Sequence, residues 1–305
     1  MSLNTNQQSL LSLLHTFSVT ARHLSFTKAA EELYLTQGGI SQRIKKLEMQ
    51  LQFNLFIRKT RRLELTPEGQ RVLSVLNSSF ESIFSTLSDI QTGELTGSLH
   101  IATSPYFASA WLIPRLPSLR QQYPNLGIKL QTKQNQSDFQ FEPYDVAIFY
   151  SQGRYPNHYS ERLFSGKRTP VCSVDYAVEH SLNKGVSALS SVNFIHRGDT
   201  SAWQFWLDEM NIDIDCKKRC DFYSDNRLAM EAAELSLGMF LARLEFAQPL
   251  IQAGKLVAPF PHIESGKGYD LVCPKGMETR AKFQAFSRWV HSEIENRKRL
   301  KPDQW

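Results

Sequence analysis

The sequence lacks a long apolar run, an export signal and a cysteine framework. Nothing in it approaches the roughly 18 consecutive apolar residues that suggest a membrane-spanning helix. Its start, MSLNTNQQSL, has neither the basic residues nor the apolar core of an export signal. The four cysteines are scattered, and the close pair Cys216 and Cys220 has no ligand histidines nearby. These absences predict a cytoplasmic protein with reduced thiols, no metal site and no cofactor.

Enzyme motifs are missing as well. The chain contains no G-x-S-x-G elbow, P-loop, dinucleotide-binding glycine fingerprint or H-E-x-x-H sequence. His196, which precedes Asp199 by three residues, and His262 form no catalytic constellation. We therefore predict no catalytic residues and expect that the protein is not an enzyme.

The chain does contain enough apolar sequence for a sizeable interior. It has 305 residues, of which 41% are apolar and 21% are charged. This composition is typical of a soluble globular protein, and the length suggests two or three domains. The net charge of +5 is compatible with a nucleic acid or another anionic partner. A mild excess of positive charge is also common in proteins without such a partner. Only the location of the basic residues along the chain can therefore indicate whether the partner is a nucleic acid.

The segment 25–43, SFTKAAEELYLTQGGISQR, has the pattern of a helix-turn-helix. The apolar stripe of the first short helix consists of Phe26, Ala29, Ala30 and Leu33. After a tight turn, Thr36 can cap a second helix. The apolar stripe of this second helix consists of Ile40, Ile44, Leu47 and Leu51. If both stripes face a core, the polar residues of the second helix are left exposed.

Basic residues concentrate around this second helix. Between residues 43 and 62 there are seven basic residues against one acidic residue, Glu48. Gln, Ser and Arg can hydrogen-bond base edges in the major groove, and Arg and Lys can bind phosphates. A charge run alone is often only a solvated surface, but beside a helix-turn-helix it predicts double-stranded DNA as the partner. The residues predicted to bind DNA are Ser25, Thr27, Thr36, Gln37, Gly38, Ser41, Gln42, Arg43, Lys45, Arg58, Arg61 and Arg62.

One long amphipathic helix follows. Thr66 can cap it with Pro67 at its first position, and apolar residues recur at spacings of three and four as far as Ile90. The helix is expected to end at Thr92, before a hinge at residues 95–97. Its apolar stripe is too long for the small domain to cover. The partner is either the rest of the chain or the same helix of a second subunit.

After residue 97, short apolar strands alternate with helical stretches. Nine strands are expected, from GSLHIAT at 97–103 to YDLVCP at 269–274. This alternation predicts a mostly parallel sheet that is covered by helices. Because one sheet of nine strands would be large, we expect two α/β lobes. The chain would cross between them near residues 162–168 and 261–268.

These motifs resemble the LysR-type transcriptional regulators. The likeness rests on S-F-T-x-A-A-E-x-L at 25–33, L-T-Q at 35–37, I-S-x-x-I-x-x-L-E at 40–48, L-F-x-R at 55–58 and L-T-P-E-G at 65–69. It continues more loosely over the rest of the chain. Within the family, the chain looks closest to activators of glycine cleavage and of D-serine deaminase. One departure is the pair Gly38-Gly39, which predicts a second helix that starts late or frays without DNA.

The resemblance implies an α+β multidomain protein. It implies a winged helix-turn-helix DNA-binding domain at 1–65, a linker helix at 66–92 and a periplasmic-binding-protein-like effector domain of two α/β lobes at 97–305. Lobe 1 would comprise about 97–162 and 268–300, and lobe 2 about 163–267. The wing would lie at 53–65, with Arg58, Arg61 and Arg62 near the DNA backbone or minor groove.

The resemblance also implies how the protein works. The linker helices would pair antiparallel in a homodimer that reads a pseudo-palindromic target. Two dimers would form a homotetramer, and the protein would be an activator. The alternative is a ligand sensor of the solute-binding type that does not bind DNA.

The predicted effector site lies where the strands end, because open α/β sheets bind ligands outside the C-terminal ends of their strands. Thr103 and Ser104 follow the first strand and precede a helix, and Ser224 and Asp225 repeat this arrangement. We therefore expect a small carboxylate, such as an amino acid whose ammonium group pairs with Asp225. The residues predicted to bind the effector are Thr103, Ser104, Thr132, Phe149, Tyr150, His196, Ser224 and Asp225.

Overall fold

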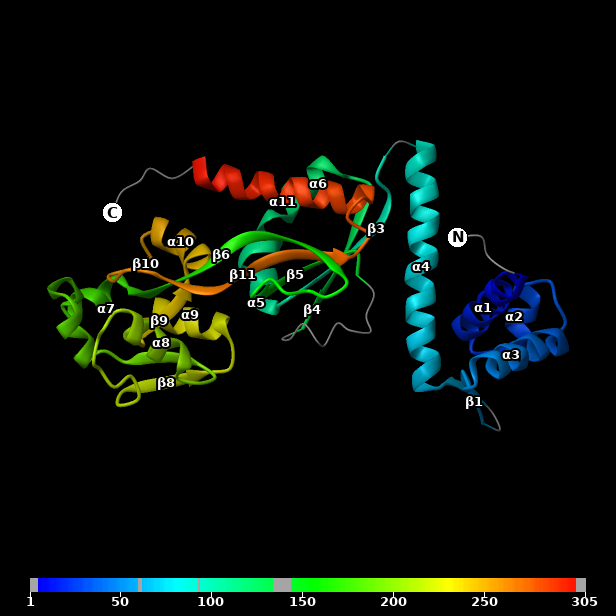
Figure 1. Cartoon of the computed structure of the whole chain (residues 1–305), viewed down its shortest axis with the longest axis horizontal. Coiled ribbons are helices and arrows are strands. Elements are labelled where there is room, and N and C mark those ends of the chain that lie inside the picture. Colours follow the sequence, from blue (N-terminus) through cyan, green and yellow to red (C-terminus); the bar gives the residue numbers. More distant parts are fainter. Residues whose placement is uncertain (1–4, 60–61, 93, 134–143, 300–305) are drawn as a thin grey trace. The chain divides into compact units, whose positions relative to one another are not determined.

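The computed structural model describes residues 5–59, 62–92, 94–133 and 144–299 (Figure 1). The chain divides into two compact units that separate near residue 98. The first unit contains a small helical domain and a long helix, and the second contains the α/β part. Among the described residues, no helix combines the length and the apolar character needed to cross a membrane.

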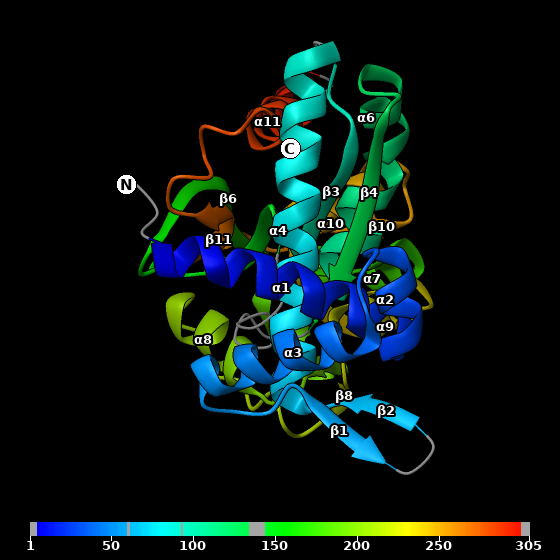
Figure 2. The same cartoon turned by 90° about the vertical axis from the view of Figure 1, so that its right-hand side faces the viewer.

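The small domain consists of a helix-turn-helix and one helix that precedes it in the chain. The helices α1 (Thr5–His23), α2 (Phe26–Glu32) and α3 (Gln37–Leu51) pack against one another (Figure 2). Its core contains side chains with no exposed surface from all three helices, namely Phe17, Ala29, Ile40, Ile44 and Leu47. The apolar stripes read from the sequence therefore do face one core, which fixes the outward face of α3.

Both helices of the motif have a hydroxyl cap, as the sequence predicts for Thr36. Ser25 Oγ accepts a hydrogen bond from the backbone N–H of Lys28 at 3.3 Å, and Thr36 Oγ1 accepts one from Gly39 at 3.0 Å. The predicted late start of α3 is wrong, because this helix begins at Gln37, ahead of both glycines. A Cβ at Gly39 would lie 3.2 Å from Thr36 Oγ1. The missing side chain thus leaves room for the cap that holds the first turn.

The wing is a two-stranded hairpin. Strands β1 (Phe56–Lys59) and β2 (Arg62–Leu65) pair antiparallel, with Lys59 opposite Arg62. The hairpin is tied to α3 by Glu48, whose carboxylate accepts hydrogen bonds from the backbone N–H groups of Leu55 at 2.8 Å and Phe56 at 3.2 Å. The single acidic residue of the basic segment is therefore structural, since it fixes the wing beside the second helix of the motif.

The long helix α4 (Pro67–Thr92) begins as predicted. Thr66 Oγ1 accepts a hydrogen bond from Gly69 N at 2.9 Å. A Cβ at Gly69 would lie only 2.2 Å from the carbonyl oxygen of Leu55, so the helix can start this close to the small domain only with glycine here. Further along, the stripe is exposed by about half or more at Ile83, Phe84, Leu87 and Ile90.

The α/β unit is built on a nine-stranded sheet in the part of the chain that the structure describes. The strand order is β4-β3-β5-β11-β6-β9-β7-β8, and β10 pairs with β6. The strands are β3 (Gly97–Thr103), β4 (Leu126–Thr132), β5 (Val146–Ser151), β6 (His158–Ser173), β7 (Phe194–Arg197), β8 (Cys220–Tyr223), β9 (Met239–Arg243), β10 (Leu256–Val257) and β11 (Ile263–Pro274).

The expectation of a mostly parallel sheet is wrong, because β6 and β11 run antiparallel to their neighbours. Parallel pairing joins β3 to β5, β7 to β8 and β7 to β9. The strands β6 and β11 pair with each other and continue through the middle of the sheet, from β5 on one side to β9 on the other. Both expected chain crossings lie on these two long strands, which join the two halves of the sheet into one.

Helices cover the sheet (Figure 1). They are α5 (Pro105–Phe107), α6 (Leu116–Gln122), α7 (Val174–Glu179), α8 (Ser201–Glu209), α9 (Asn226–Glu234), α10 (Leu244–Gln252) and α11 (Ala281–Arg299). A π-helix, Ala108–Leu112, continues α5. Large aromatic side chains fill the two halves: Trp203 and Trp206 in one, and Phe107 and Trp111 in the other, are at most 1% exposed.

The contact at Gly69 gives a first prediction. We expect Gly69→Ala to destabilise the small domain by about 1–3 kcal/mol, because the added methyl group overlaps a backbone oxygen that cannot move aside cheaply. Gly38→Ala is the matched control, since no atom lies within 4 Å of its Cβ position. Thermal and urea unfolding of both variants measures the difference. Equal stability of Gly69→Ala and the parent protein would contradict the account.

Candidate DNA interface and ligand cleft

The outward face of α3 is polar and basic. Gln37, Gly38, Gln42 and Lys45 are exposed, and Ser41 is half-buried. They share the helix with Ile40, Ile44 and Leu47 at zero exposure, so the apolar stripe holds the polar face outward. Amide, hydroxyl and ammonium groups on one face of a helix are the groups that read base edges and bind phosphates.

Two of the hydroxyl groups predicted to bind DNA cap the helices α2 and α3. Ser25 and Thr36 each accept a backbone hydrogen bond at the start of their helix, while Thr27 is exposed on the first turn of α2. A capping hydroxyl still has its proton to donate. The structure therefore gives Ser25 and Thr36 a role in folding in addition to the predicted contact.

Arg43 does not lie where the sequence analysis put it. Its guanidinium group contacts the hydroxyls of Ser12 and Thr16 on α1, at 3.5 and 3.4 Å. The physical reason is its position three residues after Ile40 and four before Leu47, which places it at the edge of the apolar stripe and not on the opposite face. Within α3, the outward-facing polar set is therefore Gln37, Gly38, Ser41, Gln42 and Lys45.

The wing brings further basic groups beside α3. Arg58 Nη1 lies 3.5 Å from Ser41 Oγ, and its guanidinium carbon lies 4.9 Å from the centre of the Phe26 ring. Lys59 and Arg62 both pair with Glu64 at 2.6 Å. The hydrogen bond from Lys59 is the main cause that lowers the pKa of the Glu64 carboxyl. Arg61 lies outside the described residues.

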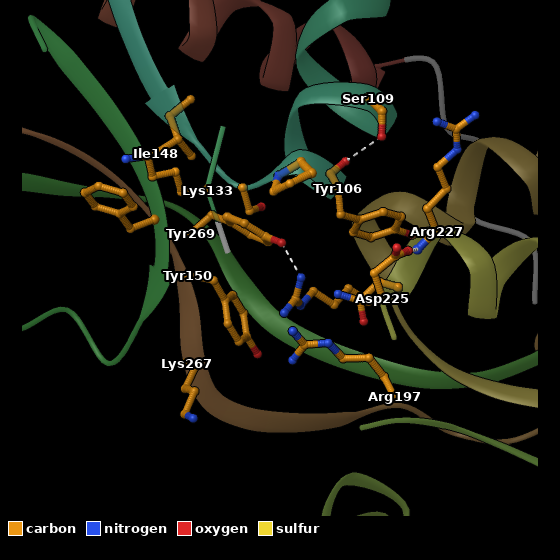
Figure 3. A pocket seen from close by; sticks show the side chains of 15 residues that line it. Tyr106, Ser109, Lys133, Ile148, Tyr150, Arg197, Asp225, Arg227, Lys267 and Tyr269 are labelled. Atoms are coloured by element: carbon orange, nitrogen blue, oxygen red, sulfur yellow. Dashed lines mark hydrogen bonds between the residues drawn. The ribbon is translucent and has the colours of Figure 1, made fainter. Parts of the chain in front are cut away.

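A cavity of about 510 Å³ opens in the α/β unit where several strands end (Figure 3). Ser104 follows β3, and Phe149 and Tyr150 lie near the end of β5. Asp225 follows β8 and caps α9, with Oδ1 accepting hydrogen bonds from the N–H groups of Arg227 at 2.8 Å and Leu228 at 3.0 Å. These four predicted effector residues line one cavity.

The other four predicted effector residues do not line it. Thr103 is buried, and its hydroxyl donates to the carbonyl oxygen of Ile148 at 2.8 Å. His196 is also buried and hydrogen-bonds the carbonyl oxygen of Cys216 at 2.9 Å. Thr132 and Ser224 are exposed away from the lining. In each case the strand-end rule found the correct edge of the sheet, but the side chain faces another way.

Sequence reasoning missed most of the polar lining. The missed polar residues are Tyr106, Ser109, Lys133, Arg197, Asn226, Arg227, Arg243, Lys267 and Tyr269. The strand-end rule that selected Ser104 could have found three of them, because Arg197 and Arg243 end β7 and β9 and Lys133 follows β4. No local pattern marks Lys267 or Tyr269, which reach the cavity only because β11 crosses the sheet.

Two tyrosines hold Arg243 in the cavity wall. It donates a hydrogen bond to Tyr269 Oη, and its guanidinium carbon lies 3.9 Å from the ring centre of Tyr150. Burial raises the pKa of Tyr269 to about 12, so this hydroxyl stays protonated. Burial opposes ionisation of Tyr150 too, but the charges of Arg243 and Arg168 and a hydrogen bond with Ser265 outweigh it and lower its pKa. The cavity wall is therefore electropositive.

The sequence matches two families. Residues 11–70 match the bacterial regulatory helix-turn-helix protein of the lysR family, and residues 92–295 match the LysR substrate binding domain. The chain belongs to the LysR family. It is a LysR-type DNA-binding transcriptional regulator with an effector-binding domain, as its motifs predict. The helix-turn-helix match argues against the alternative of a ligand sensor that does not bind DNA.

Similar proteins include members of the subgroup that the sequence motifs predict. The glycine cleavage system transcriptional activator of Escherichia coli K12 is 33% identical over 281 residues, which cover 92% of each chain. The HTH-type transcriptional regulator DsdC of the same organism is 31% identical over 293 residues, or 93% of this chain and 94% of DsdC. These matches confirm the predicted family and subgroup.

A solved structure of a LysR-type regulator has the same fold. It is full-length LysG from Corynebacterium glutamicum with bound effector Arg, which aligns with a TM-score of 0.62 over 93% of this chain and 98% of LysG. The sequence identity is 16%, so the likeness concerns the fold. It confirms the predicted fold class, a helix-turn-helix domain followed by a two-lobed α/β domain.

The outward face of α3 gives a second prediction. We expect Gln42→Ala to reduce the preference for operator over random duplex by about tenfold, because one bidentate base contact is worth about 1–3 kcal/mol of discrimination. Lys45→Ala should weaken binding to both duplexes alike, since phosphate contacts carry no sequence information. Fluorescence anisotropy with an operator selected from random duplexes measures both. An equal loss on the two duplexes for Gln42→Ala would contradict the assignment.

Proposed function

We propose that this LysR-type regulator binds a pseudo-palindromic operator as a homodimer and activates transcription when a small anionic molecule occupies the cavity of its α/β unit. The observation that supports the proposal most strongly is the outward polar face of α3, held by a fully buried stripe and flanked by the basic wing. DNA binding makes the cytoplasm its place of action.

The dimer is proposed from α4. Its first turns are covered by the small domain, where Val72, Leu73 and Leu76 pack on the core. The later stripe is not covered in this way, with exposed fractions of 67% at Phe84 and 75% at Ile90. Large apolar side chains in water favour association. Antiparallel pairing of two α4 helices would bury them and place two α3 helices on one duplex.

A homotetramer is the fuller form of the proposed assembly. It requires a second apolar surface besides α4. Val178 on α7 and Leu235 at the end of α9 are exposed by 74% and 67% in the α/β unit. Contacts through such residues would join two dimers, and four helix-turn-helix domains would then contact one stretch of DNA.

The cavity supports control by a small molecule with a negative group. Its position at the strand ends is the place where α/β sheets of this kind bind ligands, and its wall includes Arg243 and three tyrosines. LysG, which shares the fold, was solved with bound effector Arg. Occupancy alone does not change DNA binding. The ligand must bind one arrangement of the two lobes more tightly than the other. The ratio of these two affinities determines how far the equilibrium between the arrangements shifts.

A salt titration tests the DNA-binding part of the proposal. The affinity for an operator duplex should fall steeply and log-linearly with salt concentration, because each neutralised phosphate releases counterions. The full-length protein is titrated with labelled duplex at several salt concentrations. The absence of binding at low salt would remove the proposed function.

The exposed stripe of α4 gives a further prediction. Phe84→Glu should convert the dimer to a monomer and lower operator affinity by at least about tenfold, because a charge in the apolar seam is costly to bury. Ser74→Glu adds the same charge on an exposed part of α4 away from the seam and serves as the control. Light scattering after size-exclusion chromatography gives the mass. A Phe84→Glu protein that stays dimeric would show that α4 is not the interface.

A further inference from the structure

The lining of the cavity is unbalanced in charge. Among the described residues it has five basic side chains and one carboxylate. The basic residues are Lys133, Arg197, Arg227, Arg243 and Lys267, and the carboxylate belongs to Asp225. Figure 3 labels Lys133, Arg197, Arg227, Lys267 and Asp225 around the same hollow. A cavity with this excess of positive charge concentrates anions and repels cations.

Two of these arginines, Arg197 and Arg243, stand at the ends of neighbouring strands. Strands β7 and β9 are parallel neighbours, with Ile195 paired to Phe240. Continued to the strand ends, this register brings Arg197 beside the residue that precedes Arg243. Positive charges at neighbouring strand ends repel each other unless a negative charge compensates them. A bound anion would supply that compensation.

The charges lie on different parts of the fold. Arg197, Arg227 and Arg243 come from the strand ends and the helix on the β7–β9 side of the sheet, whereas Lys267 lies on the crossing strand β11. At about 510 Å³ the cavity is much larger than a single carboxylate, so it has room for two negative groups that are separated by a short carbon chain, with one group near each set.

Arg243 is built to receive one of these groups. Its hydrogen bond to Tyr269 Oη and its stacking on Tyr150 fix the guanidinium plane. A fixed guanidinium loses little freedom when it binds a carboxylate in a bidentate way. Tyr269 is 1% exposed, so the support beneath Arg243 is rigid.

The single carboxylate is partly used by the fold. Asp225 Oδ1 already accepts two backbone hydrogen bonds as the N-cap of α9. An ammonium group that pairs with the remaining oxygen, Oδ2, would also face the five cationic side chains of the lining. This placement costs electrostatic energy. The expected pairing of an ammonium with Asp225 is accordingly less favourable than a second anion contact.

We propose that the effector is a small organic dianion, a dicarboxylate that places one carboxylate on Arg243 and the other among the basic residues at the rim of the cavity. This inference rests on the proposed function, since it assumes that the cavity is the effector site. It narrows the ligand class from any small carboxylate to molecules with two separated negative groups and no ammonium.

Isothermal titration calorimetry of the full-length protein at low salt tests the proposal. The probes are succinate, glutarate and adipate, the monocarboxylates butyrate, valerate and hexanoate, inorganic phosphate, and the zwitterions glycine and serine. At least one dicarboxylate should bind saturably and at least about tenfold more tightly than its matched monocarboxylate, phosphate and both zwitterions. Equal affinity of mono- and dicarboxylates, tighter binding of a zwitterion or phosphate, or no dicarboxylate binding would overturn it.

Variants assign the binding to the cavity. Arg243→Gln and, separately, Lys267→Gln should each weaken the dicarboxylate by at least about tenfold. Lys267 is exposed, so its variant is expected to fold even if loss of Arg243 disturbs the packing of Tyr269. Lys255→Gln, which removes a charge outside the cavity, is the control and should bind as the parent does. Unchanged affinity in Lys267→Gln would overturn the proposal.

Operator binding is measured on the same samples. A protein that binds operator but prefers no dicarboxylate disproves only the dianion inference. A protein that binds a dicarboxylate but no operator disproves only the proposed function.

Discussion

The burial of one apolar stripe on α3 is the constraint on which the DNA-binding face depends. Ile40, Ile44 and Leu47 have no exposed surface, and this leaves a single rotation of the helix in which its polar side can face outward. Glu48, on the same helix, holds the wing because its carboxylate accepts two backbone hydrogen bonds from it. A helix that could rotate about its axis would present no constant set of groups to a base pair. Recognition of DNA therefore depends on the packing of this apolar stripe.

In the α/β unit, too, the packing of regular elements fixes which side chains reach the binding site. Parallel strands end at one edge and deliver their last residues to a common cavity, as β7 and β9 do with Arg197 and Arg243. The long strands β6 and β11 run through both halves and add Tyr269 from the middle of the sheet. Because the same two strands join the halves, a ligand that contacts Tyr269 and Arg243 touches both a joining strand and a strand of one half.

Sequence reasoning succeeded where local rules determine the structure. Apolar periodicity placed α2, α3 and α4, the capping residues Thr36 and Thr66 marked the starts of the last two, and the pattern of short apolar runs located the nine strands. It failed where tertiary contacts decide. The edge position of Arg43 turns it toward Ser12 and Thr16, the hydroxyl of Thr103 is used by Ile148, and the antiparallel course of β6 and β11 depends on partners far away in the chain.

The most direct test of the central claim is DNA cleavage from a label on α3. Gln42→Cys in a Cys220→Ser background, which leaves three buried cysteines, is conjugated to an iron chelate that cuts nearby DNA. We predict cuts in the major groove of each half-site, with the two clusters about 10 base pairs apart or a multiple of that spacing. The matched label at Glu31→Cys on α2 should cut more weakly or at different bases. Uncut operator, or identical cutting from both positions while the protein is bound, would contradict the account.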